Sequence, residues 1–212
     1  MRKTVQILLT YFISTGICLA QNAEKVFEEA ARAYEKSNGI AAQFTANTQS
    51  EKQRISESFE GTIQMKGEKF VLITSDTRTW YDGKTQWTYG MHSEEVYVST
   101  PEGDELQFLN PMILLRTYKK GFNLVYKGES TADTGKPAHD IQLVAKGASD
   151  IEKIDIQIEK ASSLPVRMTV FMKNGIRSLI RISKMQTGIN QPDSFFKFNP
   201  TDFPDAIEID LR

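Results

Sequence analysis

The chain has 212 residues, of which 26 are Lys or Arg and 27 are Asp or Glu, so its formal net charge at pH 7 is −1. This balance, without any basic block, excludes the charge pattern of a nucleic-acid-binding protein, and no nucleic-acid partner is expected. A single cysteine excludes a disulfide framework, so apolar packing must hold the fold together.

The first twenty residues have the pattern of a secretory signal peptide. Arg2-Lys3 forms a basic start, an apolar run extends from Val5 to Leu19, and Cys18-Leu19-Ala20 supplies small residues at the −3 and −1 positions. We expect cleavage after Ala20, export to the periplasm and a single mature domain of residues 21–212. Lipidation of Cys18 is not expected, because Ile17 stands where a lipobox has a small residue.

The mature chain is predicted to begin with an amphipathic helix. Asn22 is suited to cap its start, and residues 37–39, Ser-Asn-Gly, are suited to end it. The apolar positions that follow helical spacing are Val26, Phe27, Ala30, Ala33 and Tyr34. Such a helix buries one stripe against a sheet and leaves the other in water.

The sequence RTWYDGKTQWTYGM (78–91) predicts a β-hairpin that carries both tryptophans of the chain. Asp82-Gly83 lies between two β-favouring runs and predicts a two-residue type I′ turn. In that register Trp80 is opposite Thr85, and Trp87 and Tyr89 share the face of Trp80. An aromatic stripe is more often core than binding surface, so the hairpin alone leaves both interpretations open.

Most of the remaining chain is predicted to form strands, and one helix interrupts them. Asn110-Pro111 is a helix start and Lys119-Lys120-Gly121 a helix end. This helix is apolar around most of its circumference and must be covered on more than one side. The predicted strands are Ile40–Gln49, Ser56–Met65, Phe70–Ile73, Glu94–Ser99, Phe122–Lys127, His139–Ala145, Lys153–Lys160, Val166–Met172 and Arg177–Met185.

Successive hairpins with one apolar face predict an antiparallel sheet curled around the two helices. The chain offers little for catalysis or for a metal. His92 and His139 are far apart and have no metal-ligand spacing, and no phosphate-binding loop, GxSxG motif or cysteine nucleophile occurs. We therefore expect no enzyme activity, no metal and no cofactor.

Several stretches resemble the outer-membrane lipoprotein carrier (LolA) family of periplasmic proteins. They are the leading helix, GTIQMKGEKF (61–70), TWYDGKTQWTY (79–89), NPMILL (110–115), Leu164-Pro165 and the tail FNPTDFPDAIEIDLR (198–212). The acidic end of the tail resembles that of Bacteroidetes-type members. The resemblance implies a mainly β fold with a helical lid: an incomplete, strongly curved antiparallel β-barrel covered by helices and enclosing an apolar cavity.

The resemblance also implies a function and its partners. The protein would accept lipoproteins from an inner-membrane lipoprotein-releasing transporter, shield their acyl chains and carry them as a monomer to the outer membrane. Family members often have an arginine before a proline in the segment that matches Lys66 to Phe70, where it ties the sheet to the lid. Here the segment reads Lys66-Gly67-Glu68-Lys69, so another group must latch the lid, and the identity of the outer-membrane acceptor stays open.

Methionines are suited to a site that takes differing acyl chains, because their side chains are flexible. The alternative for each is ordinary core packing. A different function on the same scaffold is a periplasmic sensor or regulator that binds lipoproteins or lipids for signalling. The residues predicted to line the acyl-binding cavity are Met65, Phe70, Leu72, Trp80, Trp87, Tyr89, Met91, Met112, Leu115, Ile156, Met168 and Val170.

Overall fold

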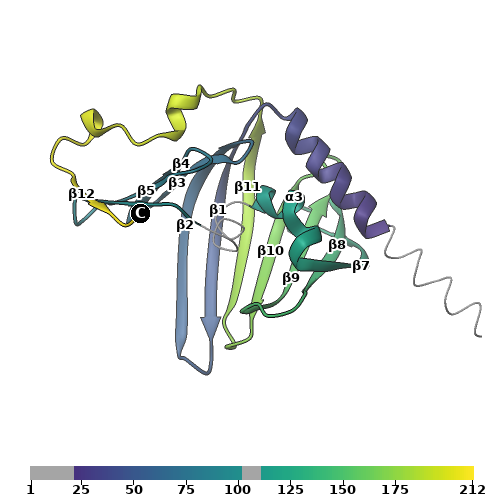
Figure 1. The fold of residues 1–212 in the computed structure, drawn as a ribbon. Coiled ribbons are helices and arrows are strands. Elements are labelled where there is room, and N and C mark those ends of the chain that lie inside the picture. The colour runs from purple at the N-terminus through teal and green to yellow at the C-terminus, as the bar shows by residue number, and fades with distance from the viewer. Residues whose placement is uncertain (1–21, 102–110) are drawn as a thin grey trace, which may run out of the picture.

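The computed structural model describes residues 22–101 and 111–212, which form one sheet with a few helices (Figure 1). The sheet has twelve strands in the order β12-β6-β5-β4-β3-β2-β1-β11-β10-β9-β8-β7. The strands are β1 (Ile40–Ser50), β2 (Ile55–Lys66), β3 (Lys69–Thr74), β4 (Thr77–Tyr81), β5 (Gln86–Gly90), β6 (Glu95–Ser99), β7 (Phe122–Thr131), β8 (Pro137–Ala145), β9 (Ile151–Glu159), β10 (Pro165–Met172), β11 (Arg177–Thr187) and β12 (Ile207–Asp210).

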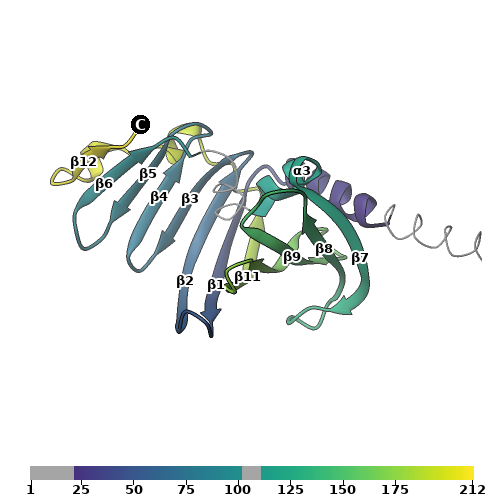
Figure 2. The same cartoon turned by 60° about the horizontal axis from the view of Figure 1, so that its bottom comes forward.

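The sheet is curved and open. Strands β7 to β11 curl tightly, whereas β2 to β6 extend away from them as a flatter wing (Figure 2). Neighbouring strands are antiparallel except β12, which pairs in parallel with β6. The prediction of a mainly β, strongly curved sheet is confirmed, but the strands do not close into a barrel because β7 and β12 end the order without pairing with each other.

Both predicted α-helices are present. The N-terminal helix occupies residues 22–36, and α3 is Pro111–Gly121. The cap position Asn110 lies outside the described residues. Within the part of the chain that the structure describes, no helix is both long and apolar enough to span a membrane.

The tryptophan hairpin forms, but its predicted register is wrong. The loop contains Asp82 to Thr85, so Trp80 is opposite Trp87 rather than Thr85. The Asp82 carboxylate accepts hydrogen bonds from the backbone N–H groups of Lys84 and Thr85, at 3.0 and 2.9 Å. Of the two expected turn residues only Gly83 has a positive φ, +101°, and a type I′ turn needs two. The Asp82 side chain thus favours a wider loop.

The tail after β11 has structure for which the sequence predicts no element. It forms the 3-10 helices η1 (Asp193–Phe196) and η2 (Pro200–Asp202) and then β12 at the edge of the sheet. The side chain of Asn199 caps η2 by accepting from Thr201 N–H. Figure 1 shows the tail running along the β3–β6 wing, at the opposite end of the sheet from α3.

Two hydrophobic clusters hold these parts together. The larger, here the main core, joins one face of the sheet from β1 to β4 and β7 to β11 with the N-terminal helix and α3. The smaller, here the tail cluster, centres on Val71, Trp80 and Phe196. Because Val71 alternates with main-core residues along β3, the two clusters lie on opposite faces of the sheet.

Candidate functional site

The main core gathers a group of the predicted cavity residues on the face of the sheet that meets the helices. Leu72 is partly buried against this cluster. The others are nearly inaccessible to solvent, with exposed fractions of 0–2 %: Met65, Phe70, Leu115, Ile156, Met168 and Val170. The side chain of Met112 lies outside the described part of the structure. These residues are therefore buried from solvent in one hydrophobic cluster with the helices.

The rest of the predicted set lies elsewhere. Trp80, Trp87 and Tyr89 belong to the tail cluster on the other face of the sheet, and Met91 is in the turn after β5, 37 % exposed. The sequence pattern correctly placed the aromatic residues on one face. It did not reveal that this face turns away from the helices, so a single cavity lined by the whole set does not form in this structure.

The N-terminal helix and α3 both contribute to the main core. Phe27 and Leu114 are fully buried in it. The rings of Phe27 and Tyr118 meet edge to face, with centroids 5.1 Å apart, a favoured aromatic geometry. The helices therefore pack against each other as well as against the sheet.

The N-terminal helix is tied to the sheet by a neutral hydrogen bond. The Tyr34 hydroxyl, near the end of the helix, donates to the backbone carbonyl of Gly67 at 2.6 Å. Gly67 is in the β2–β3 turn, the segment in which the resemblance implies an arginine latch and in which this sequence has no arginine. Tyr34 thus takes a position from which it can latch the helix.

The same β2–β3 turn is also held by the tail. Lys66 Nζ donates to the backbone carbonyl of Gln191 at 2.9 Å, and Lys69 forms an ion pair with Asp193 at 2.6 Å. The turn therefore links the N-terminal helix on one side to the start of the tail on the other.

One polar group in the main core lacks a partner. Tyr118 is 5 % exposed, and its hydroxyl makes no hydrogen bond within the described structure. Burial raises the pKa of Tyr118 to about 12, and the nearby carboxylates of Glu24 and Glu28 add to the effect. A buried hydroxyl without a partner costs about 1–3 kcal/mol, so the closed packing of the helices is weakened at this point.

The tail cluster is an aromatic assembly. Trp80 meets Phe198 and Phe203 edge to face at 5.4 and 5.5 Å, and Tyr89 lies 4.7 Å from Phe203. A pocket of about 500 Å³ lies between these rings and the tail, with Arg78 and Lys197 at its walls. Four phenylalanines between positions 195 and 203 were the sequence signal for this cluster, because so many rings in a tail require a surface to cover.

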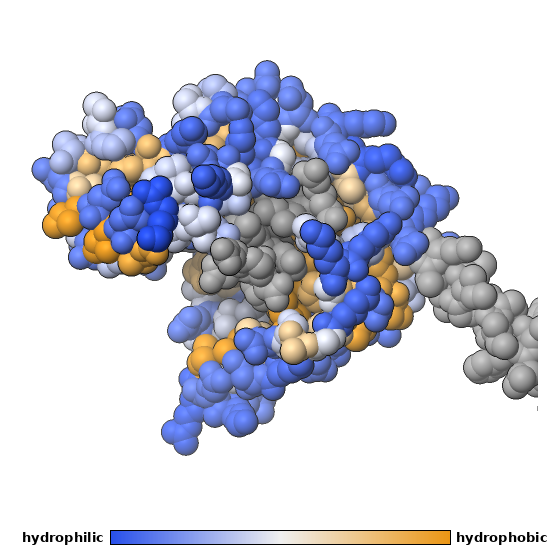
Figure 3. Space-filling view, in the orientation of Figure 1, coloured by the Kyte–Doolittle hydropathy of each residue, from blue (hydrophilic) through white to orange (hydrophobic). Residues whose placement is uncertain are grey.

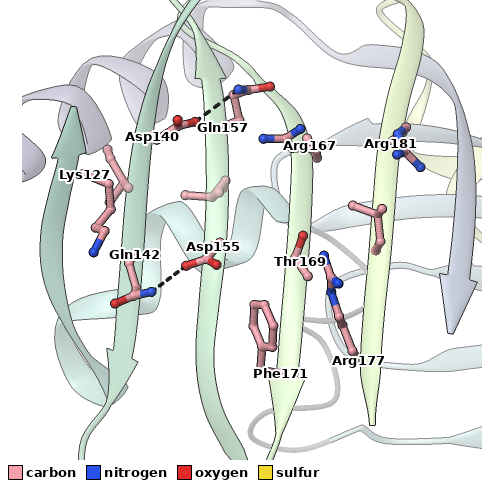
Figure 4. A pocket seen from close by; sticks show the side chains of 13 residues that line it. Lys127, Asp140, Gln142, Asp155, Gln157, Arg167, Thr169, Phe171, Arg177 and Arg181 are labelled. Atoms are coloured by element: carbon pink, nitrogen blue, oxygen red, sulfur yellow. Dashed lines mark hydrogen bonds between the residues drawn. The ribbon is translucent and has the colours of Figure 1, made fainter. Parts of the chain in front are cut away.

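A polar groove of about 410 Å³ crosses the outer face of β8 to β11 (Figure 4). Gln157 donates to Asp140 at 3.1 Å, and Gln142 donates to Asp155 at 2.8 Å. Two of the groove's arginines have a carboxylate beside them: Arg167 and Arg181 both pair with Asp133, at 3.6 and 2.8 Å. The third, Arg177, lies over the Phe171 ring at 5.4 Å. These pairs satisfy most of the groove's polar groups, but the side-chain oxygen of Gln157 is buried without a hydrogen-bond partner in the described structure.

The histidines take no part in a catalytic constellation. His139 Nδ1 lies 2.9 Å from the Tyr126 hydroxyl, and its pKa is lowered by burial and by the charge of Lys160. His92 is an exposed turn residue 3.5 Å from Asp76. No cluster of three or more potential metal ligands occurs among the described residues.

Exposed hydrophobic surface in Figure 3 includes a patch at the left, over β12, and another beside α3. At the β12 end, Ile207 and Leu211 are 62 % and 63 % exposed. Polar residues cover most of the remaining surface in this view.

Solved structures share this fold at low sequence identity. A conserved protein from Thermus thermophilus matches with a TM-score of 0.55 and 15 % identity over 86 % of this chain and 98 % of its own. A DUF1329 family protein from Desulfovibrio piger matches with a TM-score of 0.50 and 12 % identity, over 87 % and 99 %. A LolA superfamily protein from Nitrosomonas europaea gives 0.47 and 11 %, over 83 % and 97 %.

Sequence comparison is more specific than these structural likenesses. No curated protein matches the chain. The family model for the outer membrane lipoprotein carrier protein LolA matches residues 13–175, which include both helices and the strands from β1 to β10. The chain therefore belongs to the LolA family of outer membrane lipoprotein carrier proteins.

Proposed function

We propose that this protein binds the acyl chains of lipoproteins between its helices and the apolar face of its sheet, and carries them through the periplasm from the inner to the outer membrane. The observation that carries the proposal is the main core itself. Its sheet residues, Met168 and Val170 among them, are covered by helices rather than by a second sheet, so an apolar surface would open if the helices moved away.

The packing of the main core also bears on how cargo is released. Burial of one methylene contributes about 0.8 kcal/mol, so a long acyl chain transferred from water contributes on the order of 10 kcal/mol. In this protein, however, the chain would replace side chains that already cover the surface. The net free energy of loading is then smaller than the transfer value, because one set of apolar contacts is exchanged for another. Delivery to a tighter acceptor therefore needs no nucleotide.

The helices form the lid in this proposal, and the Tyr34–Gly67 hydrogen bond is its latch. This hydrogen bond of 2.6 Å adds to the apolar packing of the helix in the main core, and it adds less than a charged pair would. A latch of this modest strength suits a carrier that must open for each cargo molecule. The proposed donor is the inner-membrane lipoprotein-releasing transporter, and the protein acts as a monomer without a cofactor.

The proposal is tested by asking where an acyl chain goes. The exported protein is purified without detergent, and lipoproteins that co-purify are identified by mass spectrometry. Purified protein is then loaded with a fatty acid that carries a diazirine near its methyl end, and the photolabelled peptides are mapped. Labels on β10, β2 or α3 support the proposal.

The tail cluster supplies an internal control in the same experiment, because its pocket is also apolar but lies on the other face of the sheet. Labels confined to peptides with Trp80 or Phe203, or no uptake of the probe together with no co-purified lipoprotein, would overturn the proposal.

A further inference from the structure

The unpartnered hydroxyl of Tyr118 has a distinctive position. It sits in the last two turns of α3, in the main core, while the next residues along the helix, Lys119 and Lys120, are exposed. The ring packs on Phe27 of the N-terminal helix. The Tyr118 hydroxyl is thus a hydrogen-bond donor at the seam between the two helices, meaning the line along which they pack on each other. It is also close to the rim of the apolar face, meaning the edge at which solvent-exposed residues begin.

The surroundings of this hydroxyl are unusual for a buried donor. Glu24 and Glu28 are near enough to influence it electrostatically, but neither accepts a hydrogen bond from it in the described structure. Glu28 instead pairs with Arg32 and Lys119, each at 3.8 Å. Buried polar groups are almost always hydrogen-bonded, so a donor left without an acceptor in the closed protein points to an acceptor that arrives with a ligand.

The chemistry of the proposed cargo supplies such an acceptor. Acyl chains are joined to a lipoprotein through ester and amide groups, whose carbonyl oxygens accept hydrogen bonds and donate none. The hydrocarbon would go into the main core, and the carbonyl end would stay near the rim because the polar body of the cargo must remain in water. A neutral hydroxyl at the seam is the right partner for that carbonyl.

We propose that the Tyr118 hydroxyl donates a hydrogen bond to an ester or amide carbonyl of the bound acyl group, and so makes the site select acyl chains over plain hydrocarbon chains. The inference rests on the proposed function. Since ionisation would remove the donor, the high pKa of Tyr118, about 12, keeps the hydroxyl protonated across the physiological range.

The test compares two monomeric probes that differ in one carbonyl: a lysophospholipid with an ester-linked chain and its alkyl ether analogue of the same length. Both displace a fluorescent apolar dye from the wild-type protein and from the Tyr118→Phe variant. We expect the wild type to bind the ester about 3- to 10-fold more tightly than the ether, the ratio for one net hydrogen bond, and the variant to bind both equally.

A matched control is Tyr81→Phe. Tyr81 is also a buried main-core tyrosine, 4 % exposed, but it lies on strand β4, and its ring packs on Phe70 of strand β3. The control is expected to keep the ester preference. Loss of the preference in Tyr81→Phe as well would overturn the assignment to Tyr118.

Thermal unfolding gives an independent readout. Because Tyr118→Phe removes an unpaired buried hydroxyl, we expect the melting temperature of the ligand-free variant to rise by about 2–4 °C or more. A fall would mean that the hydroxyl already has a partner, and would overturn the inference. Equal binding of ester and ether by the wild type overturns this inference alone, whereas failure to bind either probe overturns the proposed function with it.

Discussion

Removal of the Tyr34 hydroxyl is the most direct perturbation of the proposed latch. Tyr34→Phe keeps the ring, which is 4 % exposed in the main core, and deletes the 2.6 Å hydrogen bond to Gly67. A net hydrogen bond contributes about 0.5–1.5 kcal/mol, which corresponds to a factor of about 2 to 13 in an equilibrium constant. We expect the population with the helix detached to rise by this factor, and the apparent affinity for an acyl probe to rise with it, because the closed state competes with the ligand.

Hydrogen exchange and probe titration measure these two effects. The backbone amides of residues 22–36 should exchange faster in Tyr34→Phe by the same factor, while those of β8 and β9 keep their rates. The control is Tyr126→Phe, which removes a comparable 2.9 Å hydrogen bond, to His139, that joins strands β7 and β8 rather than a helix to the sheet. The latch would be refuted if Tyr34→Phe and Tyr126→Phe lowered the melting temperature equally, and if Tyr34→Phe changed neither the amide exchange of the N-terminal helix nor the affinity for the acyl probe.

Further predictions concern the tail cluster, the acid stability and the sheet. Phe196→Ala should lower the free energy of unfolding by about 3–5 kcal/mol, because Phe196 is fully buried; tryptophan fluorescence should shift to the red while acyl binding stays unchanged, and reduced binding would contradict the separation of the two faces. Lys136, 2.7 Å from the carboxylate of Glu159, holds the pKa of that group below its ordinary value of 4.5, so Glu159 stabilises the fold above pH 4.5 and this contribution disappears as the pH falls through the lowered pKa. In urea titrations, the free energy of unfolding of Glu159→Gln should therefore fall less steeply with decreasing pH than that of the wild type. An equally steep fall in both proteins would exclude this role. Gly61→Ala should cost about 1–3 kcal/mol, because its Cβ would lie 2.8 Å from the Phe44 ring and 2.3 Å from a carbonyl oxygen of β3; an unchanged melting temperature would contradict it.

The helices and most strands could be predicted from local sequence because their signals are local. Pro111 starts α3 and Gly121 ends it, as their backbone preferences require. Alternation along β10 placed Met168 and Val170 on one face, and both are in the main core. Such patterns depend only on the period of the backbone and on burial.

The choice between the two faces of the sheet could not be predicted in the same way. Trp80 and Phe70 are both almost fully buried, but on opposite faces of the sheet. The tail covers the face that carries Trp80, and the helices lie over the face that carries Phe70. A strand buried on both sides has no polar face to mark its orientation. Which aromatic residue meets which cover depends on contacts between segments more than 100 residues apart, such as that of Trp80 with Phe198.

The Tyr34–Gly67 contact has a consequence for the conditions under which the protein works. Its acceptor is a main-chain oxygen, which every residue type would supply at position 67, and neither partner carries a charge. Mobile ions screen charged pairs but have little effect on a neutral contact of this kind. An ion pair at this place would weaken as the salt concentration rises, whereas the strength of the Tyr34–Gly67 hydrogen bond should stay nearly the same in dilute and in concentrated salt.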